Sequence, residues 1–463
     1  MGTKDFLLAP FILMIIYALA FFIRNRYIDK DDPTRSYFII GLNLKVIGAF
    51  ATAMIYWYYY GTGDTIWYYK YVSGWRDFIS QDSTTGLKLF FHGYYDNDFF
   101  VQRNLWRIRS WDKSYMVVVK IATFVSFFVF RTYIGIAIVF SFISYLGIWL
   151  LYRVFYHLYP SLYKQLAYAI LFVPSVVFWG SGLFKDTITI GCVGWAVYSV
   201  YRVFINPKRR FVNGFLLVLN IYMIILIKTY IIACLVPMIL AWLVLTYRSN
   251  IKSKYVKFAM TPILIVATLI GGFVMTRQLS AMSDTFSFDQ LEKRAEDMVW
   301  WHDKVKELYG EDGGGGSNYT LGNPYDFSPT GILKKIPAAI NVTLFRPYLW
   351  EAGNPVMLFS ALESFAIFLL FMVLLMRLKL KLLPKMFGEP FLVLCFGFSL
   401  LFSVGVGITS ANFGALVRYK IPAMPFFIGG LVIVYYKHKW SKEEKKKLKE
   451  QVVMERSNLE LDT

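Results

Sequence analysis

The sequence predicts an all-α polytopic integral membrane protein with about eleven transmembrane helices and additional amphipathic helices on the outer leaflet. Composition is the first reason. The chain has 463 residues, of which 57% are hydrophobic and 19% aromatic, and its mean hydropathy is +0.48. A soluble core cannot bury that much apolar surface. The second reason is pattern, because the apolar stretches are continuous and do not alternate as the strands of a β-barrel would.

Runs of about 16 to 22 apolar residues define the expected spans. They are residues 6–23, 38–60, 132–152, 165–180, 187–204, 214–227, 229–246, 257–275, 357–376, 390–408 and 421–436. The run 115–130 is short and contains Lys120, so it fits a re-entrant or interfacial helix as well as a span. The first run is interpreted as a retained span, because no small-residue cleavage site follows it.

Basic residues indicate which side of the membrane each connection faces. Five basic clusters lie within residues 24–35, 202–210, 248–257, 377–385 and 437–463. An eleven-span count puts all five on one side, which the positive-inside rule assigns to the cytoplasm. The net charge of +19 is therefore interpreted as a topology and lipid-headgroup signal, and nucleic acid is not expected as a partner. The predicted location is a bacterial cytoplasmic (inner) membrane, with the C-terminus in the cytoplasm.

The chain is expected to form a single transmembrane domain over residues 1–436, followed by a basic cytoplasmic tail over 437–463. Two larger segments fall on the outer side. The juxtamembrane segment 61–114 mixes aromatic with charged residues, as amphipathic interfacial helices do. The loop 276–335 contains a run of four glycines and is interpreted as a passive surface loop or as a mobile flap over a cavity.

Most of the unusual polar residues fall on this outer side, directly beside hydrocarbon. Asp64 follows the helix-breaking Gly61 and Gly63, and Lys185 and Asp186 follow a turn rich in small residues. Each acid is either a helix N-cap or a functional group at the membrane surface. Lys185 is either a phosphate-binding cation or a side chain that snorkels to the headgroups.

Further charged candidates lie at the ends of later runs. They are Lys228, Arg346, Glu351 and Arg418. The two arginines are the stronger candidates for phosphate, because a guanidinium group binds phosphate bidentately and keeps its charge. Snorkelling is the ordinary alternative for each cation. We expect Asp64, Lys185, Arg346 and Arg418 to line one outer cavity.

Three short motifs point to a family. They are Asp64-Thr-Ile-Trp-Tyr68-Tyr69, the turn PSVVFWGSGLFKD that ends at Asp186, and RYKIPAMPF, which begins at Arg418. Together they resemble the GT-C class of membrane glycosyltransferases and bacterial exopolysaccharide polymerases of the EpsG and Wzy kind. The resemblance implies an enzyme that joins a polyprenyl-phosphate-linked sugar to a glycan acceptor at the extracytoplasmic face.

The resemblance also implies roles for single residues. Asp64 matches the acid that acts as base or binds a metal, and Arg418 matches the cation that holds the lipid-linked phosphate. The commonest pattern of the class has an Asp-x-Asp or Glu-x-Asp pair after the first span, which this chain lacks, although Asp96-Asn97-Asp98 follows in the same outer segment. A divalent metal is therefore left open as a cofactor, and no metal ligand is assigned.

Two other functions stay open at this point. A transporter or flippase for a lipid-linked or anionic solute also needs outward-facing cations, but such proteins usually show paired halves and ionisable groups at mid-membrane. The sequence shows no internal repeat, and its polar residues gather at one surface, which favours the enzyme. A non-catalytic component of a secretion or envelope complex is the third interpretation.

Overall fold

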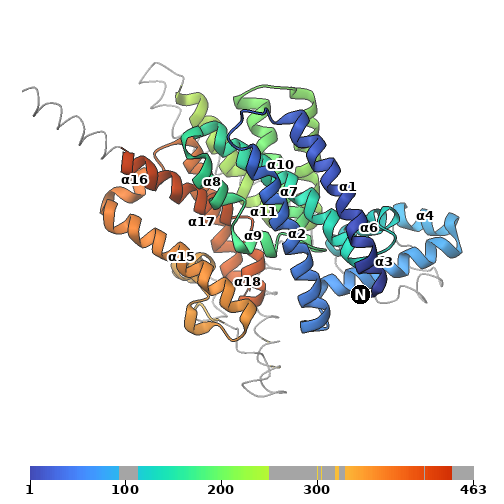
Figure 1. Ribbon diagram of the computed structural model, residues 1–463. Coiled ribbons are helices and arrows are strands. Elements are labelled where there is room, and N and C mark those ends of the chain that lie inside the picture. The colour runs from blue at the N-terminus through green and yellow to red at the C-terminus, as the bar shows by residue number, and fades with distance from the viewer. Residues whose placement is uncertain are drawn as a thin grey trace, which may run out of the picture.

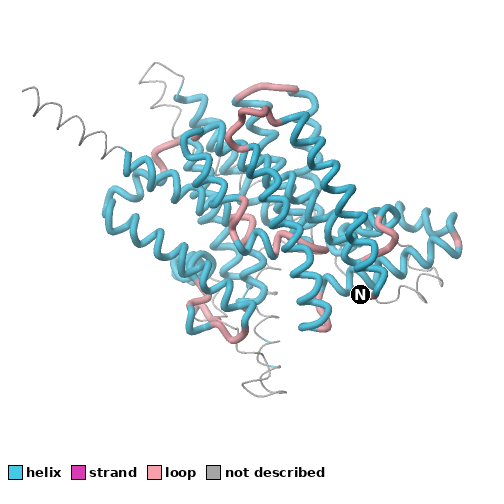
Figure 2. Tube along the Cα trace, viewed as in Figure 1, coloured by secondary structure: helices cyan, strands magenta, loops and turns pink. Residues whose placement is uncertain are grey.

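The computed structural model describes residues 1–92, 113–249, 319–322, 329–410 and 412–440, together with Trp300 and Lys304. Throughout these residues the regular structure is helical, without β-strands, and short loops join the helices (Figure 2). The predicted span 257–275, most of the loop 276–335, the Asp96-Asn97-Asp98 motif and the tail beyond residue 440 lie outside the described residues.

Seven helices in the described part of the chain are long and apolar enough to cross a membrane. They are Thr3–Tyr27, Arg35–Tyr60, Tyr133–Leu158, Lys185–Ile205, Arg210–Arg248, Pro355–Met386 and Pro390–Ser410. An eighth crossing results if Phe413–Tyr419 and Met424–Trp440, which are bent by 67°, count as one broken span. These helices confirm the prediction of an all-α, multi-pass membrane protein.

The centre of the bundle is formed by α7 (Tyr133–Leu158), α10 (Lys185–Val200) and α11 (Arg210–Ser249) (Figure 1). In α7, 78% of the most apolar stretch is buried, against 22% in α1 (Thr3–Tyr27). Both α1 and α2 (Arg35–Met54) pack against α7. The apolar face of α1 is thus left for lipid, whereas α7 is surrounded by protein.

The other side of the bundle is built from later helices. Here α17 (Pro390–Ser410) packs against α11, and α14 (Pro329–Phe345) packs against α17. At the edge of the bundle, α15 (Pro355–Leu378) is followed by the short α16 (Leu382–Met386), on the left in Figure 1. After α17 and a sharp bend, the chain continues into the helix Met424–Trp440, whose first part is mostly buried.

The chain reverses direction inside α11, at Lys228. The backbone of Lys228 is not helical, with φ −147° and ψ 75°. The Tyr247 hydroxyl, near the end of α11, donates to the Phe204 carbonyl at 2.6 Å, although Phe204 precedes the start of α11 by only a few residues. The helix therefore runs out and back, with Lys228 at the turn between the predicted runs 214–227 and 229–246.

The predicted span 165–180 is broken into α8 (Tyr163–Ile170) and α9 (Pro174–Phe178). The turn that follows was expected on the outer surface, but Ser181 and Leu183 in this turn are fully buried. The Gly180 carbonyl accepts from Lys45 Nζ at 2.5 Å. Irregular backbone at this depth is tolerated because protein, and not lipid, surrounds it.

Outside the bundle core, α3 (Asp64–Gln81), α4 (Ser83–His92) and α6 (Lys113–Phe128) pack together, on the right in Figure 1. The α6 helix begins where Ser114 Oγ accepts from Lys185 Nζ at 2.7 Å, at the first residue of α10. It ends just before the first residue of α7, Tyr133, whose amide donates to Asp5 Oδ1 at 2.6 Å. Both ends of α6 thus lie at the end of the bundle where α7 and α10 begin.

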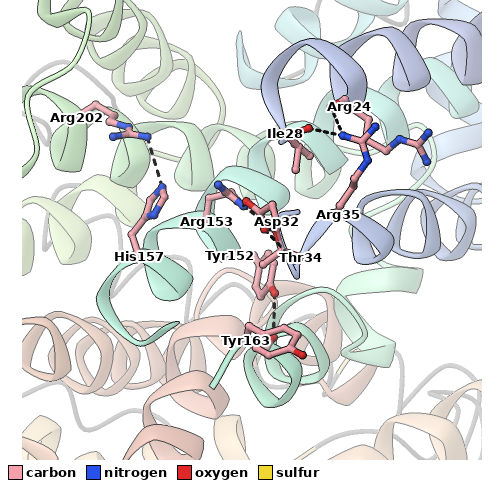
Figure 3. Close-up of polar contacts among 10 residues, drawn as sticks. All are labelled: Arg24, Ile28, Asp32, Thr34, Arg35, Tyr152, Arg153, His157, Tyr163 and Arg202. Atoms are coloured by element: carbon pink, nitrogen blue, oxygen red, sulfur yellow. Dashed lines mark hydrogen bonds and ion pairs between the residues drawn. The ribbon is translucent and has the colours of Figure 1, made fainter. Parts of the chain in front are cut away.

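The opposite end of the bundle carries the described members of the five basic clusters. Arg153, near the end of α7, pairs with Asp32 in the α1–α2 connection at 2.5 Å (Figure 3). Arg202 Nη2 lies 3.4 Å from His157 Nε2, and Lys437 pairs with Glu389. Basic residues from distant parts of the chain therefore lie at this end of the bundle.

Lys45 provides a stability test of the broken span. Its fully buried ammonium group donates to the carbonyls of Val176 at 2.9 Å and Gly180 at 2.5 Å. Lys45→Met keeps the side-chain length but leaves both buried carbonyls without that donor, so we expect a loss of about 1–3 kcal/mol. Thermal unfolding of the purified protein in detergent measures this loss as a lower Tm.

Lys164→Met is the matched control, because Lys164 is exposed on α8 and its replacement should leave the Tm unchanged. A Lys45→Met protein at least as stable as the wild type would show that the broken span does not depend on this lysine.

Candidate functional site

Arg418 joins two carboxylates that are far apart in the sequence. Its Nη2 donates to Asp64 Oδ2 at 2.8 Å and its Nε donates to Asp186 Oδ2 at 3.3 Å. The second oxygen of Asp186, Oδ1, accepts from Lys228 Nζ. Two acids and two bases from four separate segments thus form one charge network.

The members of this network differ in how far they are buried. The side chains of Asp186, Lys228 and Arg418 are 0%, 6% and 15% exposed, whereas the side chain of Asp64 is 45% exposed. Buried charges are tolerated when they are paired and hydrogen-bonded. Asp186, Lys228 and Arg418 therefore form the fixed interior of the network, and Asp64 lies at its edge.

Helix ends place the charged groups. Asp64 is the first residue of α3, Asp186 lies in the first turn of α10, and Arg418 lies in the last turn of α18 (Phe413–Tyr419). Acids at helix N-termini and a cation at a C-terminus each complement the helix dipole. Gly63 and Phe184 occupy the N-cap positions of α3 and α10, so neither acid is the N-cap residue, and the carboxylates bond to cations from other segments.

Gly63 is needed for the approach to Asp64. Its φ of +124° lies in the region that L side chains rarely adopt, and a Cβ there would come within 2.6 Å of the Tyr56 ring. Glycine is therefore the residue that lets the chain leave the π-helical turn Ile55–Tyr60 and start α3 beside Arg418.

A pocket of about 430 Å³ opens beside Arg418. Aromatic side chains from distant segments contribute to it, and among the described residues of its lining Arg418 is the charged one. The lining consists of Tyr56, Tyr60, Thr62, Gly63, Trp179, Asn354, Val356, Met357, Gly414, Ala415, Val417, Arg418 and Tyr419. An apolar and aromatic wall with a single guanidinium group suits a ligand that has both a flat face and an anionic group.

The remaining predicted site residues do not join this pocket. Lys185 donates to Ser114 Oγ at 2.7 Å and lies 5.5 Å from the centre of the Tyr115 ring. Arg346 forms a separate ion pair with Glu351, with Nε 3.0 Å from each carboxylate oxygen. The structure thus brings Asp64 and Arg418 into contact, whereas the described lining of this pocket includes Arg418 but not Asp64, Lys185 or Arg346.

The pair of Arg346 and Glu351 is held by local hydrogen bonds. Burial raises the pKa of the Glu351 carboxyl, but hydrogen bonds from Arg346 and from the Tyr348 amide, together with the Arg346 charge, lower it more. The resulting pKa of Glu351 is below its ordinary value. Glu351 is therefore a stable counter-ion for Arg346, which leaves Arg346 less available for a ligand than the sequence suggested.

Among the buried charges of the described residues, Lys45 and Glu363 were not identified as candidates from the sequence. Lys45 is fully buried, and Glu363 accepts from the Ser175 amide at 2.6 Å with its side chain 9% exposed. Both sit inside apolar runs, LNLKVIG and ALESFA. A charged side chain inside an apolar span is costly to bury, so its position in the run could have identified each residue as a functional or structural candidate.

A metal site is not apparent in the described part of the chain. No group of three or more His, Cys, Asp or Glu side chains there has a suitable arrangement. Asp64 and Asp186 both bond to Arg418, so a guanidinium group takes the position between the two acids where a divalent ion would bind. These two acids do not fit a metal centre in this arrangement.

Comparisons with protein-family models, curated proteins and solved structures give no match to this chain. The chemistry of the site itself is therefore the basis for inferring its function.

The network predicts different costs for removing its two acids. Asp186→Asn leaves two buried cations without their shared carboxylate, so we expect a loss of about 3–5 kcal/mol. Asp64→Asn removes a partly exposed partner, so we expect a loss of about 1 kcal/mol or less. Thermal unfolding of the two purified variants compares them directly, and equal Tm values would show that Asp186 does not anchor the network.

Proposed function

We propose that the chain is a membrane glycosyltransferase or polysaccharide polymerase that uses a polyprenyl-linked sugar donor at the extracytoplasmic face. The observation that carries the proposal is the contact of Asp64 with Arg418 at the edge of a pocket lined by aromatic side chains. A carboxylate and a guanidinium group are the pair that such a transfer needs, one for the acceptor hydroxyl and one for the phosphate of the donor.

The proposed reaction moves one proton and exchanges one bond at the sugar. Asp64 accepts the proton of the acceptor hydroxyl as its oxygen bonds to the anomeric carbon of the donor. The bond from this carbon to the phosphate oxygen breaks, and the electron pair leaves with the polyprenyl phosphate. Arg418 stabilises the charge that develops on the leaving phosphate, in a site that Asp186 and Lys228 keep rigid.

The pocket supports a sugar ligand by its shape and composition. Tyr56, Tyr60, Trp179 and Tyr419 all contribute to its wall. Aromatic rings offer flat apolar faces, and their hydroxyl or indole groups offer hydrogen bonds at the edges. A sugar ring presents the same combination of C–H faces and peripheral hydroxyls.

The alternative is a transporter or flippase for a lipid-linked or anionic solute, and one observation favours it. Lys45 is buried in the interior of α2, against the broken helices α8 and α9. Ionisable groups at depth and discontinuous helices are typical of transporters. The alternative predicts solute flux through vesicles without any glycosidic product.

The proposal includes a topology. About eleven spans, with the basic end of the bundle in the cytoplasm, place the Asp64–Arg418 contact on the outer side of a bacterial cytoplasmic membrane. The positive-inside rule and the clustering of basic residues at the opposite end support this orientation.

Asp64→Asn is the test of catalysis. The amide keeps the shape of the side chain but loses the basicity of the carboxylate, so glycan transfer should fall by about two to four powers of ten. The assay uses purified protein with a polyprenyl-linked sugar donor and a glycan acceptor, and mass spectrometry detects the product.

Arg418→Lys is the companion variant. It keeps the charge but loses the two-pronged geometry, so KM for the donor should rise more than kcat falls. Full activity in a folded Asp64→Asn protein would remove Asp64 from catalysis. Absence of product from the wild type with verified substrates, together with flux in vesicles, would favour the transporter.

Cysteine labelling tests the orientation. Ser83→Cys lies on the exposed α3–α4 connection near the proposed outer end, and Leu380→Cys lies in the opposite connection, where Leu380 is 94% exposed. In intact cells an impermeant maleimide should label Ser83→Cys and spare Leu380→Cys. The native Cys192 and Cys395 are buried and Cys234 is partly buried, so background should be low. The reverse pattern would place the site in the cytoplasm.

A further inference from the structure

We infer that Asp64 is an exchangeable counter-ion: a phosphate ester anion takes its place on Arg418, and this exchange is what frees the Asp64 carboxylate. The inference rests on the proposed function for the identity of the anion. It addresses a conflict in the geometry, because the proposed base and the proposed phosphate-binding group are bonded to each other at 2.8 Å. While that contact is made, Asp64 Oδ2 and Arg418 Nη2 are both occupied.

The two acids on Arg418 are not equivalent. Asp186 is fully buried and bonds to both Lys228 and Arg418 Nε. Asp64 is 45% exposed and bonds only to Arg418 Nη2 among the ion pairs of the described residues. Displacing Asp186 would leave a carboxylate in the protein interior, whereas Asp64 can turn to water. An incoming anion therefore replaces Asp64, while Asp186 keeps the guanidinium group in position.

The pocket gives the anion a route to Arg418. Gly63, directly before Asp64, and Arg418 both line it, and Arg418 is the charged group of its described lining. A guanidinium group offers parallel N–H donors that match phosphate oxygens, and phosphate makes a stronger charge-assisted contact than a half-exposed carboxylate. The exchange also keeps the network close to neutral, since one anion leaves as another enters.

The released carboxylate has a favourable place to go. Asp64 is the first residue of α3, where the helix dipole and the free backbone amides stabilise an anion. Substrate binding and activation of the base become a single event, so Asp64 is not free in the absence of a donor.

The test is binding of phosphate probes without any turnover. Purified full-length protein in nanodiscs of zwitterionic phosphatidylcholine is titrated by calorimetry with farnesyl phosphate and, separately, with inorganic phosphate. Asp64→Asn removes the charged competitor, so its affinity for farnesyl phosphate should exceed that of the wild type by about three- to tenfold, the range of a half-exposed ion pair. The comparison of the two probes shows whether the site takes a lipid phosphate or any phosphate.

Asp77→Asn is the matched control. Asp77 pairs with Arg131 at 2.5 Å, and the two side chains are 57% and 34% exposed, so the variant loses the same charge from a similar pair that does not line the pocket. It should bind farnesyl phosphate with wild-type affinity. If Asp77→Asn gained as much affinity for farnesyl phosphate as Asp64→Asn, the gain would be explained by the change in overall charge. That result would overturn the inferred exchange of counter-ions.

A structure of the wild type with farnesyl phosphate provides the second readout. It should show the phosphate on Arg418 and Asp64 turned away from it. A phosphate bound while Asp64 stays on Arg418 would overturn the inference, as would wild-type affinity in Asp64→Asn, and both leave the proposed function standing. Absence of phosphate binding in wild type and variant alike would overturn the inference together with the phosphate-binding role of Arg418.

Discussion

A cation taken out of water needs partners, and in this protein the guanidinium group of Arg418 obtains them from two different helices. Asp186 holds it from the interior, where Lys228 is a second cation on the same carboxylate, and Asp64 holds it from the edge. This requirement fixes the start of α3, the start of α10, the reversal of α11 and the short α18 relative to one another. Of these elements α18 lines the pocket, together with the chain that leads into α3, Trp179 and the start of α15.

Lys45 meets the same requirement in a different way. No acid forms an ion pair with it among the described residues, and its ammonium group bonds to backbone carbonyls that α9 and the following turn leave free. The carbonyl oxygens freed by the break in the helix accept hydrogen bonds from the Lys45 ammonium group. The carbonyls and the ammonium group thereby lower the free-energy cost of burying each other. The carbonyl pairing of Lys45 thus holds α2 against α9 and the turn that follows it.

The sequence was sufficient for the features that depend on local composition. Apolar runs predicted the helices, and Gly61 and Gly63 predicted the start of a helix at Asp64. The sequence was not sufficient for contacts between distant segments. It did not show that Arg418 would pair with Asp64 and Asp186, that Glu351 would take Arg346, or that the turn before Lys185 would be buried. Those outcomes depend on helix packing, which determines which charges meet.

The balance of two acids against two bases has an evolutionary consequence. A single change at Asp186 leaves two buried cations without their shared carboxylate, whereas loss of Lys228 or of Arg418 still leaves Asp186 with one cationic partner. Asp186 is therefore expected to be retained in related sequences wherever Lys228 and Arg418 are both retained. Asp64 lies outside this constraint because water can solvate it. Retention of Asp64 in lineages that keep the other three would then reflect selection for activity and not for folding.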